Sequence, residues 1–158
     1  MDRHRIGIVI PAYNESKTIQ VVISKVEKYG TIIVVDDGSS DNTSTLAAEL
    51  GCIVVQHKAN RGYDSALQSG FEAAVEIECD FVITFDADGQ HNPDVLNTFI
   101  SALTDGADVV IGIRDYRQRL AEYIFTWISS FKWGISDPLC GLKAYRTIVF
   151  KKLGHSIT

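Results

Sequence analysis

The stretch Asp80–Pro93 reads DFVITFDADGQHNP. Its apolar run, Phe81–Phe85, is rich in β-branched and aromatic residues, which is typical of a short buried strand. Two carboxylates, Asp86 and Asp88, follow in the turn, and the Asn-Pro pair at the end has the residues expected at the start of a helix. Because open α/β sheets bind ligands beyond the carboxyl ends of their strands, this stretch predicts both a buried strand and a candidate site.

The turn after this strand is a candidate metal site. Asp86, Asp88 and the amide of Gln90 form an all-oxygen cluster of the kind that suits Mg²⁺ or Mn²⁺ together with phosphates. Asp-Ala-Asp on its own is more often an acidic turn that caps a helix. The rest of the chain has to decide between these two interpretations.

The remaining sequence alternates between apolar strands and amphipathic helices. We predict strands at Ile6–Ile10, Thr31–Val35, Cys52–Val55, Phe81–Phe85 and Asp108–Ile111, and helices at Ser16–Tyr29, Asp41–Leu50, Asn60–Glu78, Pro93–Leu103 and Lys143–Leu153. Short, uninterrupted apolar strands that alternate with helices are typical of a parallel sheet covered on both faces. The 158 residues fit one α/β domain spanning 1–158.

A further amphipathic stretch follows the last of these strands. Its apolar residues recur at helical spacing: Leu120, Tyr123, Ile124, Trp127, Ile128 and Phe131. This pattern predicts either a helix packed on the sheet or a helix whose aromatic edge enters a membrane surface.

Composition excludes several classes of protein. The net charge of -5 argues against a nucleic-acid binder, whose surface is basic. The three cysteines, Cys52, Cys79 and Cys140, are widely separated, which fits reduced core thiols better than a disulfide framework or a zinc site. No run reaches the roughly 18 apolar residues that a membrane span needs. We therefore expect a cytoplasmic protein, either free or peripheral at the inner face of the membrane.

Four predicted strand ends carry polar, ligand-facing residues. They are Pro11–Glu15, Asp36–Gly38, Asn60–Gly62 and Asp86–Asp88. Parallel strands bring these segments to one edge of the sheet, and the fold itself requires no acids there. Asp36 and Asp37 alone fit turn and cap residues, but beside a second acidic strand end they favour contacts with a base or ribose.

Six motifs, in order along nearly the whole chain, resemble a family 2 glycosyltransferase. They are IPAYNE at Ile10–Glu15, VVDDGSSDNT at Val34–Thr43, NRGYDSALQSGF at Asn60–Phe71, DADGQHNP at Asp86–Pro93, GIR at Gly112–Arg114 and DPLCGLKAYR at Asp137–Arg146. The last motif is similar to the dolichol-phosphate (polyprenol-phosphate) mannosyltransferase-like branch.

The resemblance implies a GT-A (Rossmann-like) fold with a mostly parallel sheet. It also implies inverting, metal-dependent transfer of a sugar from a UDP- or GDP-linked donor to a polyprenyl phosphate or a glycan, as in cell envelope glycan biosynthesis. The nucleotide-binding half is expected at about 1–90. The acceptor-side half, at about 91–158, is shorter than the branch usually shows, since only 17 residues separate Arg119 from Asp137.

The resemblance also implies roles for individual residues on the donor side. Pro11, Tyr13 and Glu15 are expected around the nucleotide, Asp36 and Asp37 at base and ribose with Asp37 favoured, Asp86 at donor and metal, and Asp88 and Gln90 at the metal. Arg61 falls in a motif that lines the donor pocket, although it also fits a solvated surface arginine. His91 is not expected to join this oxygen-rich metal site. We expect His57 to end its strand in a solvated loop.

On the acceptor side, Arg114 and Arg117 suit a phosphate, because guanidinium groups bind phosphate oxygens in pairs. Arg119 is interpreted as a solvated surface residue. Asp137 occupies the family's position for an acceptor-side acid, and it equally fits an Asp-Pro turn. A lipid phosphate acceptor is already ionised and needs no base, whereas a sugar hydroxyl would need such a carboxylate.

Two other function classes remain as alternatives. The first is a nucleotide-sugar-binding module with weak catalysis. The second is a phospho-receiver-like signalling domain, which pairs two acids after its first strand and places a lysine after its fifth. Here the pair Asp36-Asp37 follows the second strand, and Arg114 follows the fifth, so this alternative fits less well.

Overall fold

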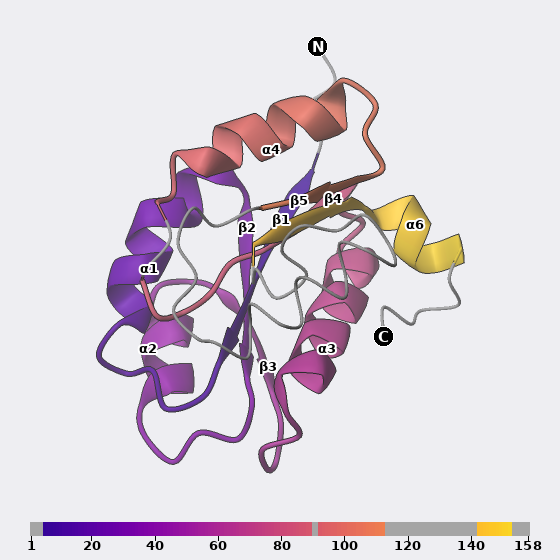
Figure 1. Cartoon of the computed structure of the whole chain (residues 1–158). Helices are drawn as coiled ribbons and strands as arrows, with labels where there is room; N and C mark the ends of the chain where they lie inside the picture. The colour runs from indigo at the N-terminus through magenta and orange to yellow at the C-terminus, as the bar shows by residue number, and fades with distance from the viewer. Residues whose placement is uncertain (1–4, 90–91, 113–141, 153–158) are drawn as a thin grey trace, which may run out of the picture.

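The computed structural model describes residues 5–89, 92–112 and 142–152. Its strands are β1 (Ile6–Ala12), β2 (Thr31–Asp36), β3 (Ile53–Gln56), β4 (Phe81–Thr84), β5 (Val109–Ile111) and β6 (Lys143–Arg146). Its helices are α1 (Ile19–Val26), the 3₁₀ turn η1 (Glu27–Tyr29), α2 (Thr43–Glu49), α3 (Tyr63–Glu76), α4 (Val95–Thr104) and α6 (Thr147–Lys152). Together they form one sheet with helices on both faces (Figure 1).

The sheet has the strand order β3-β2-β1-β4-β6-β5. Strands β2 and β4 both pair in parallel with β1, and β3 pairs in parallel with β2. The carboxyl ends of these four strands therefore meet at one edge of the sheet, as the sequence predicted. The mixed α/β fold with a mostly parallel sheet is confirmed.

The prediction of one helix over Lys143–Leu153 is wrong for its first four residues. Lys143–Arg146 form β6, which runs antiparallel to both of its neighbours, with Phe81 opposite Arg146 and Val110 opposite Ala144. Only Thr147–Lys152 is helical. The strand exists because β4 and β5 leave a gap in the sheet that these residues fill, and no local sequence signal encodes that gap.

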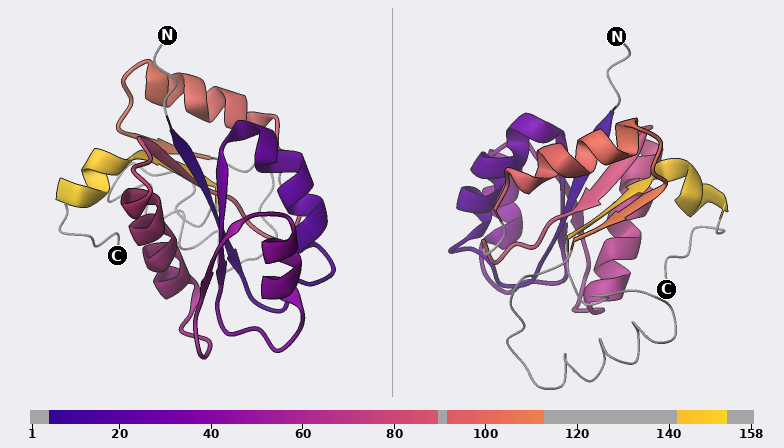
Figure 2. Two further views of the ribbon diagram at one scale, coloured as in Figure 1. Left: turned by 180° about the vertical axis from the view of Figure 1, so that it is seen from behind. Right: turned by 45° about the horizontal axis from the view of Figure 1, so that its top comes forward.

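Alternating side chains of the central strands divide the core into two layers. Ile8 and Ile10 of β1 pack on one face with buried residues of α1, α2 and α4. Val9 packs on the other face with α3 and with Phe150 of α6. Figure 2 shows the helices on the two sides of the sheet. This double coverage explains why the central strands are apolar on both faces.

Helix α3 lies unusually close to the sheet. A Cβ atom at Gly70 would stand 2.3 Å from Cγ1 of the fully buried Val9, so only glycine allows this approach. The contact fixes the helix against β1, and its first turn therefore lies beside the carboxyl end of that strand.

Two sequence predictions fall partly or wholly outside the described residues. The stretch 120–131, with its two readings, lies outside them. Within the described ranges, no helix is long and apolar enough to cross a bilayer. Of the three cysteines, Cys79 is buried, Cys52 is partly buried, and Cys140 is not described.

Candidate functional site

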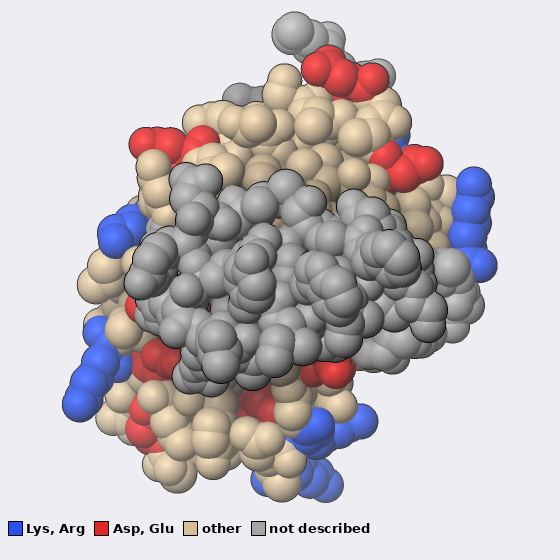
Figure 3. Space-filling model, in the orientation of Figure 1, with Lys and Arg blue, Asp and Glu red and all other residues tan. Residues whose placement is uncertain are grey.

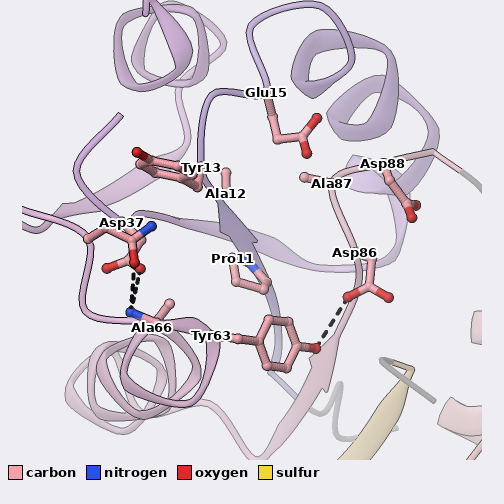
Figure 4. Close-up of a pocket in the computed structure, with 12 residues that line it drawn as sticks. Pro11, Ala12, Tyr13, Glu15, Asp37, Tyr63, Ala66, Asp86, Ala87 and Asp88 are labelled. Atoms are coloured by element: carbon pink, nitrogen blue, oxygen red, sulfur yellow. Dashed lines mark hydrogen bonds between the residues drawn. The ribbon is translucent and has the colours of Figure 1, made fainter. Parts of the chain in front are cut away.

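A cavity of about 380 Å³ opens at the carboxyl edge of the sheet, a volume ordinary for small-molecule sites (Figure 4). It is lined by Pro11, Ala12, Tyr13, Glu15, Asp37, Asn60, Gly62, Tyr63, Ala66, Asp86, Ala87 and Asp88. These residues come from the end of β1, the loops after β1, β2, β3 and β4, and the start of α3. The structure thus brings together strand ends that are far apart in sequence.

The loops after β1 and β2 are joined to each other by hydrogen bonds. Asn14 has a left-handed backbone (φ 57°), and its side-chain oxygen accepts a hydrogen bond from the backbone N–H of Ser40 at 2.9 Å. In return, the Asn14 backbone N–H donates to the hydroxyl of Ser39 at 2.9 Å. A residue that can adopt positive φ and accept a hydrogen bond is needed here, and asparagine does both. The cavity-lining Tyr13 and Glu15 flank this junction.

Asp41 joins the same two loops a second time. Asp41 accepts hydrogen bonds from the hydroxyl and backbone N–H of Thr43 and from the backbone N–H of Ser16. The bonds from Thr43, followed by those from Ser16, lower the pKa of Asp41 from 3.8 to about 2. The hydroxyl of Thr18 donates to Glu15 Oε2 at 2.7 Å, which orients this acid at the cavity.

The carboxylate of Asp37 is buried in the wall of the cavity and held by three hydrogen bonds. It is 4% exposed and accepts three hydrogen bonds: from His57 Nδ1 at 2.6 Å, from the Arg61 backbone N–H at 2.9 Å and from the Gly62 backbone N–H at 2.8 Å. Burial alone raises the pKa of Asp37. The hydrogen bonds from His57, Arg61 and Gly62 outweigh it, so the pKa lies below its ordinary value.

The prediction that His57 lies in a solvated loop is wrong. The residue is 8% exposed, and its second ring nitrogen, Nε2, lies 2.9 Å from the hydroxyl of Ser69 on α3. The sequence showed only a polar residue after a short strand. The partners that bury the ring, Asp37 and Ser69, lie 20 and 12 residues away.

Asp36 and Asp37, although adjacent, are placed differently. Asp36 is fully buried and accepts hydrogen bonds from the Ser39 backbone N–H at 3.0 Å and from Gln56 Nε2 at 3.2 Å. Asp36 does not belong to the cavity lining given above, whereas Asp37 does. Contacts of either residue with a base or ribose stay predictions.

The segment after β4 carries the predicted metal ligands. Ala87 is buried and anchors the turn, while Asp86 is half-buried and Asp88 is exposed. The hydroxyl of Tyr63 donates to Asp86 Oδ1 at 3.2 Å across the cavity mouth (Figure 4). Tyr63 was missed from the sequence, because this contact joins α3 to a loop 23 residues away.

The donor set fits a hard divalent cation that is shared with a ligand. In residues 5–89, 92–112 and 142–152, no group of three or more His, Cys, Asp or Glu could hold a metal by itself. Asp86 and Asp88 supply carboxylate oxygens, and Mg²⁺ is commonly held by one or two carboxylates together with substrate phosphates. The third predicted ligand, Gln90, lies outside the described residues.

The described cavity lining is acidic. It contains Glu15, Asp37, Asp86 and Asp88 and, among the described residues, no Lys or Arg. Arg61 is exposed beside the cavity and contributes a backbone N–H to Asp37. On the visible part of the face in Figure 3, acidic side chains lie in the lower middle and also along the upper edges, and Lys and Arg stand mostly at the sides. Within the described lining, a polyanionic ligand would meet four carboxylates and no Lys or Arg side chain.

The predicted acceptor-side residues lie outside the described residues. These are Arg114, Arg117, Arg119 and Asp137, together with His91 beside the metal segment. Their roles stay predictions.

Comparison with known proteins identifies relatives of this chain. The family model described as glycosyl transferase family 2 matches residues 7–153. The UDP-N-acetylglucosamine–dolichyl-phosphate N-acetylglucosaminyltransferase of Methanococcus voltae is 36% identical over 184 residues, which cover 96% of this chain and 73% of that protein. The polyprenol monophosphomannose synthase of Mycolicibacterium smegmatis is 30% identical over 170 residues, covering 94% of this chain and 64% of that protein.

The fold has a close structural counterpart. Glucosyl-3-phosphoglycerate synthase from Mycobacterium tuberculosis, solved with Mn²⁺, UDP-glucose and phosphoglyceric acid, superposes with a TM-score of 0.79 at 24% identity. The match covers 93% of this chain and 58% of that one, so this chain spans little more than half of its structural counterpart. Because the family model covers almost the whole sequence and the named relatives are glycosyltransferases, this chain belongs to glycosyl transferase family 2, in its polyprenyl-phosphate branch, and has the GT-A fold.

Proposed function

We propose that this chain transfers a sugar, with inversion at the anomeric carbon, from a nucleoside-diphosphate sugar to a polyprenyl phosphate, and that it needs Mg²⁺ or Mn²⁺. The observation that carries the proposal is the cavity at the carboxyl edge of the sheet, which joins an ordered loop network to a pair of acids. The named relatives act on dolichyl phosphate or are named for polyprenol products, which supports a lipid phosphate acceptor.

The donor nucleotide is assigned to the side of the cavity formed by the loops after β1, β2 and β3. Tyr13 is 49% exposed at this side and offers an aromatic face for a base. Asp37 has four acceptor positions on its two oxygens, and three of them are used by His57, Arg61 and Gly62. The remaining position on Oδ2 can accept an N–H or O–H of the nucleotide.

The diphosphate is assigned to the side formed by Asp86 and Asp88. A divalent cation bound there supplies charge neutralisation for the diphosphate that leaves when the sugar bond breaks. Asp86 is oriented by Tyr63, and Asp88 stands exposed at the mouth. The acidity of the described lining supports this assignment, because without a cation these carboxylates would repel a diphosphate.

The acceptor phosphate is assigned to Arg114 and Arg117 on the basis of the sequence motifs. A lipid phosphate arrives ionised, so its attack requires no general base. Asp137 is reserved for the alternative in which the acceptor is a glycan hydroxyl. The lipid acceptor places the reaction at a membrane surface.

Calorimetric titration with UDP and GDP, each with Mn²⁺ and with EDTA, tests the donor half of the proposal. We expect metal-dependent binding of one nucleotide. Asp88→Asn removes one carboxylate at the cavity. We expect this variant to lose the metal-dependent binding of the nucleotide. Asp64→Asn removes the same charge from an exposed position at the start of α3 that does not line the cavity, and it serves as the matched control.

Four results would contradict the proposal. Folded protein that binds neither nucleotide with Mn²⁺ present would refute the donor site. Binding of equal strength in EDTA would refute the metal requirement, and so would an Asp88→Asn protein that keeps the metal dependence. Transfer is then measured with a radioactive nucleoside-diphosphate sugar and polyprenyl phosphate, as the formation of a radioactive lipid-linked sugar. Binding without transfer would favour a nucleotide-sugar-binding module.

A further inference from the structure

His57 is a buried polar residue that lies behind the cavity rather than in its described lining. The side chains of His57 and Asp37 are each 6% exposed. Both ring nitrogens are used: Nδ1 lies 2.6 Å from Asp37 Oδ1, and Nε2 lies 2.9 Å from the hydroxyl of Ser69. The imidazole therefore links the loop after β2 to the middle of α3.

The identity of the partners fixes the proton on one ring nitrogen. The ionised carboxylate of Asp37 can only accept hydrogen bonds, so His57 Nδ1 must carry a proton. The hydroxyl of Ser69 can either donate or accept, so Nε2 is satisfied with or without a proton. The bond to Asp37 is therefore kept in both protonation states of the ring.

Asp37 passes this restraint on to the cavity wall. Its Oδ1 is shared between His57 Nδ1 and the Arg61 backbone N–H, and its Oδ2 accepts from the Gly62 backbone N–H. Gly62 has φ 91°, a left-handed conformation that favours glycine, and it lines the cavity together with Asn60. The loop before α3 thus takes its shape from a carboxylate whose position depends on His57.

We propose that His57 is a positioning residue of this site: through its Nδ1–H it holds the Asp37 carboxylate, and thereby the Asn60–Gly62 loop, in the geometry that receives a nucleotide. The inference rests on the proposed function in that it takes the ligand of the cavity to be a nucleotide. In this role His57 itself contacts no ligand atom.

Three variants separate positioning from ordinary core packing. His57→Leu keeps apolar volume but has no donor for Asp37. His57→Asn places an amide N–H near the position of Nδ1, so it restores the bond to Asp37 and loses only the bond to Ser69. Ser69→Ala loses the same second bond from the other side.

The readout is the dissociation constant of UDP and of GDP with Mn²⁺, measured by calorimetry well below the melting temperature of each full-length variant. Loss of a hydrogen bond to a charged group predicts that His57→Leu binds about ten- to a hundredfold more weakly. His57→Asn and Ser69→Ala are expected to stay within about threefold of the unmodified protein. Binding by His57→Leu at unmodified strength overturns the inference, and so does an equal loss in His57→Asn.

A second measurement needs neither nucleotide nor a folded His57→Leu protein. In the unmodified protein with ¹⁵N-labelled histidine, we expect a slowly exchanging, downfield proton on His57 Nδ1, and a bare Nδ1 overturns the inference. If the unmodified protein binds no nucleotide, the proposed function fails, and this proton still decides whether His57 holds Asp37.

Discussion

Asp37→Asn tests the central hydrogen-bond network of the site. The asparagine side chain keeps one acceptor oxygen and replaces the other with an NH₂ group. With NH₂ at the Oδ1 position, the bonds from His57 and Arg61 are both lost, whereas at the Oδ2 position only the bond from Gly62 is lost. The second orientation is favoured, because the Gly62 N–H also has Asn60 Oδ1 at 3.1 Å.

The cost follows from this orientation. One hydrogen bond to a charged group disappears, and we expect the free energy of unfolding to fall by about 1.5–3 kcal/mol at pH 7. Urea denaturation followed by far-UV circular dichroism measures it. The same change is expected to weaken nucleotide binding, because Asp37 lines the cavity.

The pH dependence provides a second check on the same variant. The pKa of Asp37 in the folded protein lies below its ordinary value of 3.8, so its ionised form stabilises the fold above about pH 4. That contribution is lost as the pH falls through the lowered pKa. The difference in unfolding free energy between the unmodified protein and Asp37→Asn should therefore shrink in acid.

Asp36→Asn is the matched control, because it makes the same change one residue earlier at a fully buried carboxylate. One partner of Asp36 is Gln56 Nε2, and a glutamine amide can turn by about 180° to offer its oxygen instead. We expect this variant to cost less than about 1 kcal/mol. If Asp37→Asn costs no more than Asp36→Asn, the reasoning about the three fixed donors is wrong.

Three further outcomes are expected. Gly70→Ala should lower the free energy of unfolding by about 1–3 kcal/mol in urea, because its new methyl group would overlap the buried Val9. Asp41→Asn should lower the free energy of unfolding at neutral pH. Because the pKa of Asp41 is lowered from 3.8 to about 2, this loss should disappear as the pH falls from about 4 to about 2. Tyr63→Phe should leave thermal unfolding unchanged and weaken metal-dependent nucleotide binding by about two- to tenfold, because Asp86 loses an orienting donor.

Each of these three predictions can be contradicted by one result. Glu76→Ala, at an exposed position of the same helix, is the control for Gly70→Ala and should change the free energy of unfolding by less than about 0.5 kcal/mol. If Gly70→Ala costs no more than this control, α3 can move away from the sheet. A cost of Asp41→Asn that persists unchanged at pH 2 would exclude its carboxylate as the cause. Unaltered nucleotide affinity in Tyr63→Phe would show that Asp86 needs no support from the hydroxyl.

The sequence predicted the parts of the site that local patterns encode. The strand Phe81–Thr84 and the acids after it were identifiable because a buried parallel strand is apolar throughout and then turns abruptly polar. The meeting of the strand ends followed from the parallel topology alone. The placement of Asp37 and Asp86 on one cavity was therefore predictable before any contact was known.

What the sequence missed depends on contacts between distant residues. Lys143–Arg146 form a strand because they pair with β4 on one side and β5 on the other. Their conformation is therefore decided by residues more than 30 positions away. His57 was assigned to solvent because its two partners are invisible in a local window. The hydrogen bond from Tyr63 to Asp86 likewise depends on α3 lying across from the end of β4, which no local pattern encodes.

The positions of the lining residues determine which experiment can decide which half of the proposal. Every described residue that lines the cavity falls between Pro11 and Asp88, within the predicted nucleotide-binding half. The loops of this half are held by their own hydrogen bonds, such as those of Asn14 and Asp37. Nucleotide titration therefore reports on the donor site independently of the acceptor side. A chain that binds a nucleotide with metal but transfers no sugar would favour a nucleotide-sugar-binding module. A chain that also transfers sugar would support both halves of the proposal, and Arg114 is then the first acceptor-side residue to change.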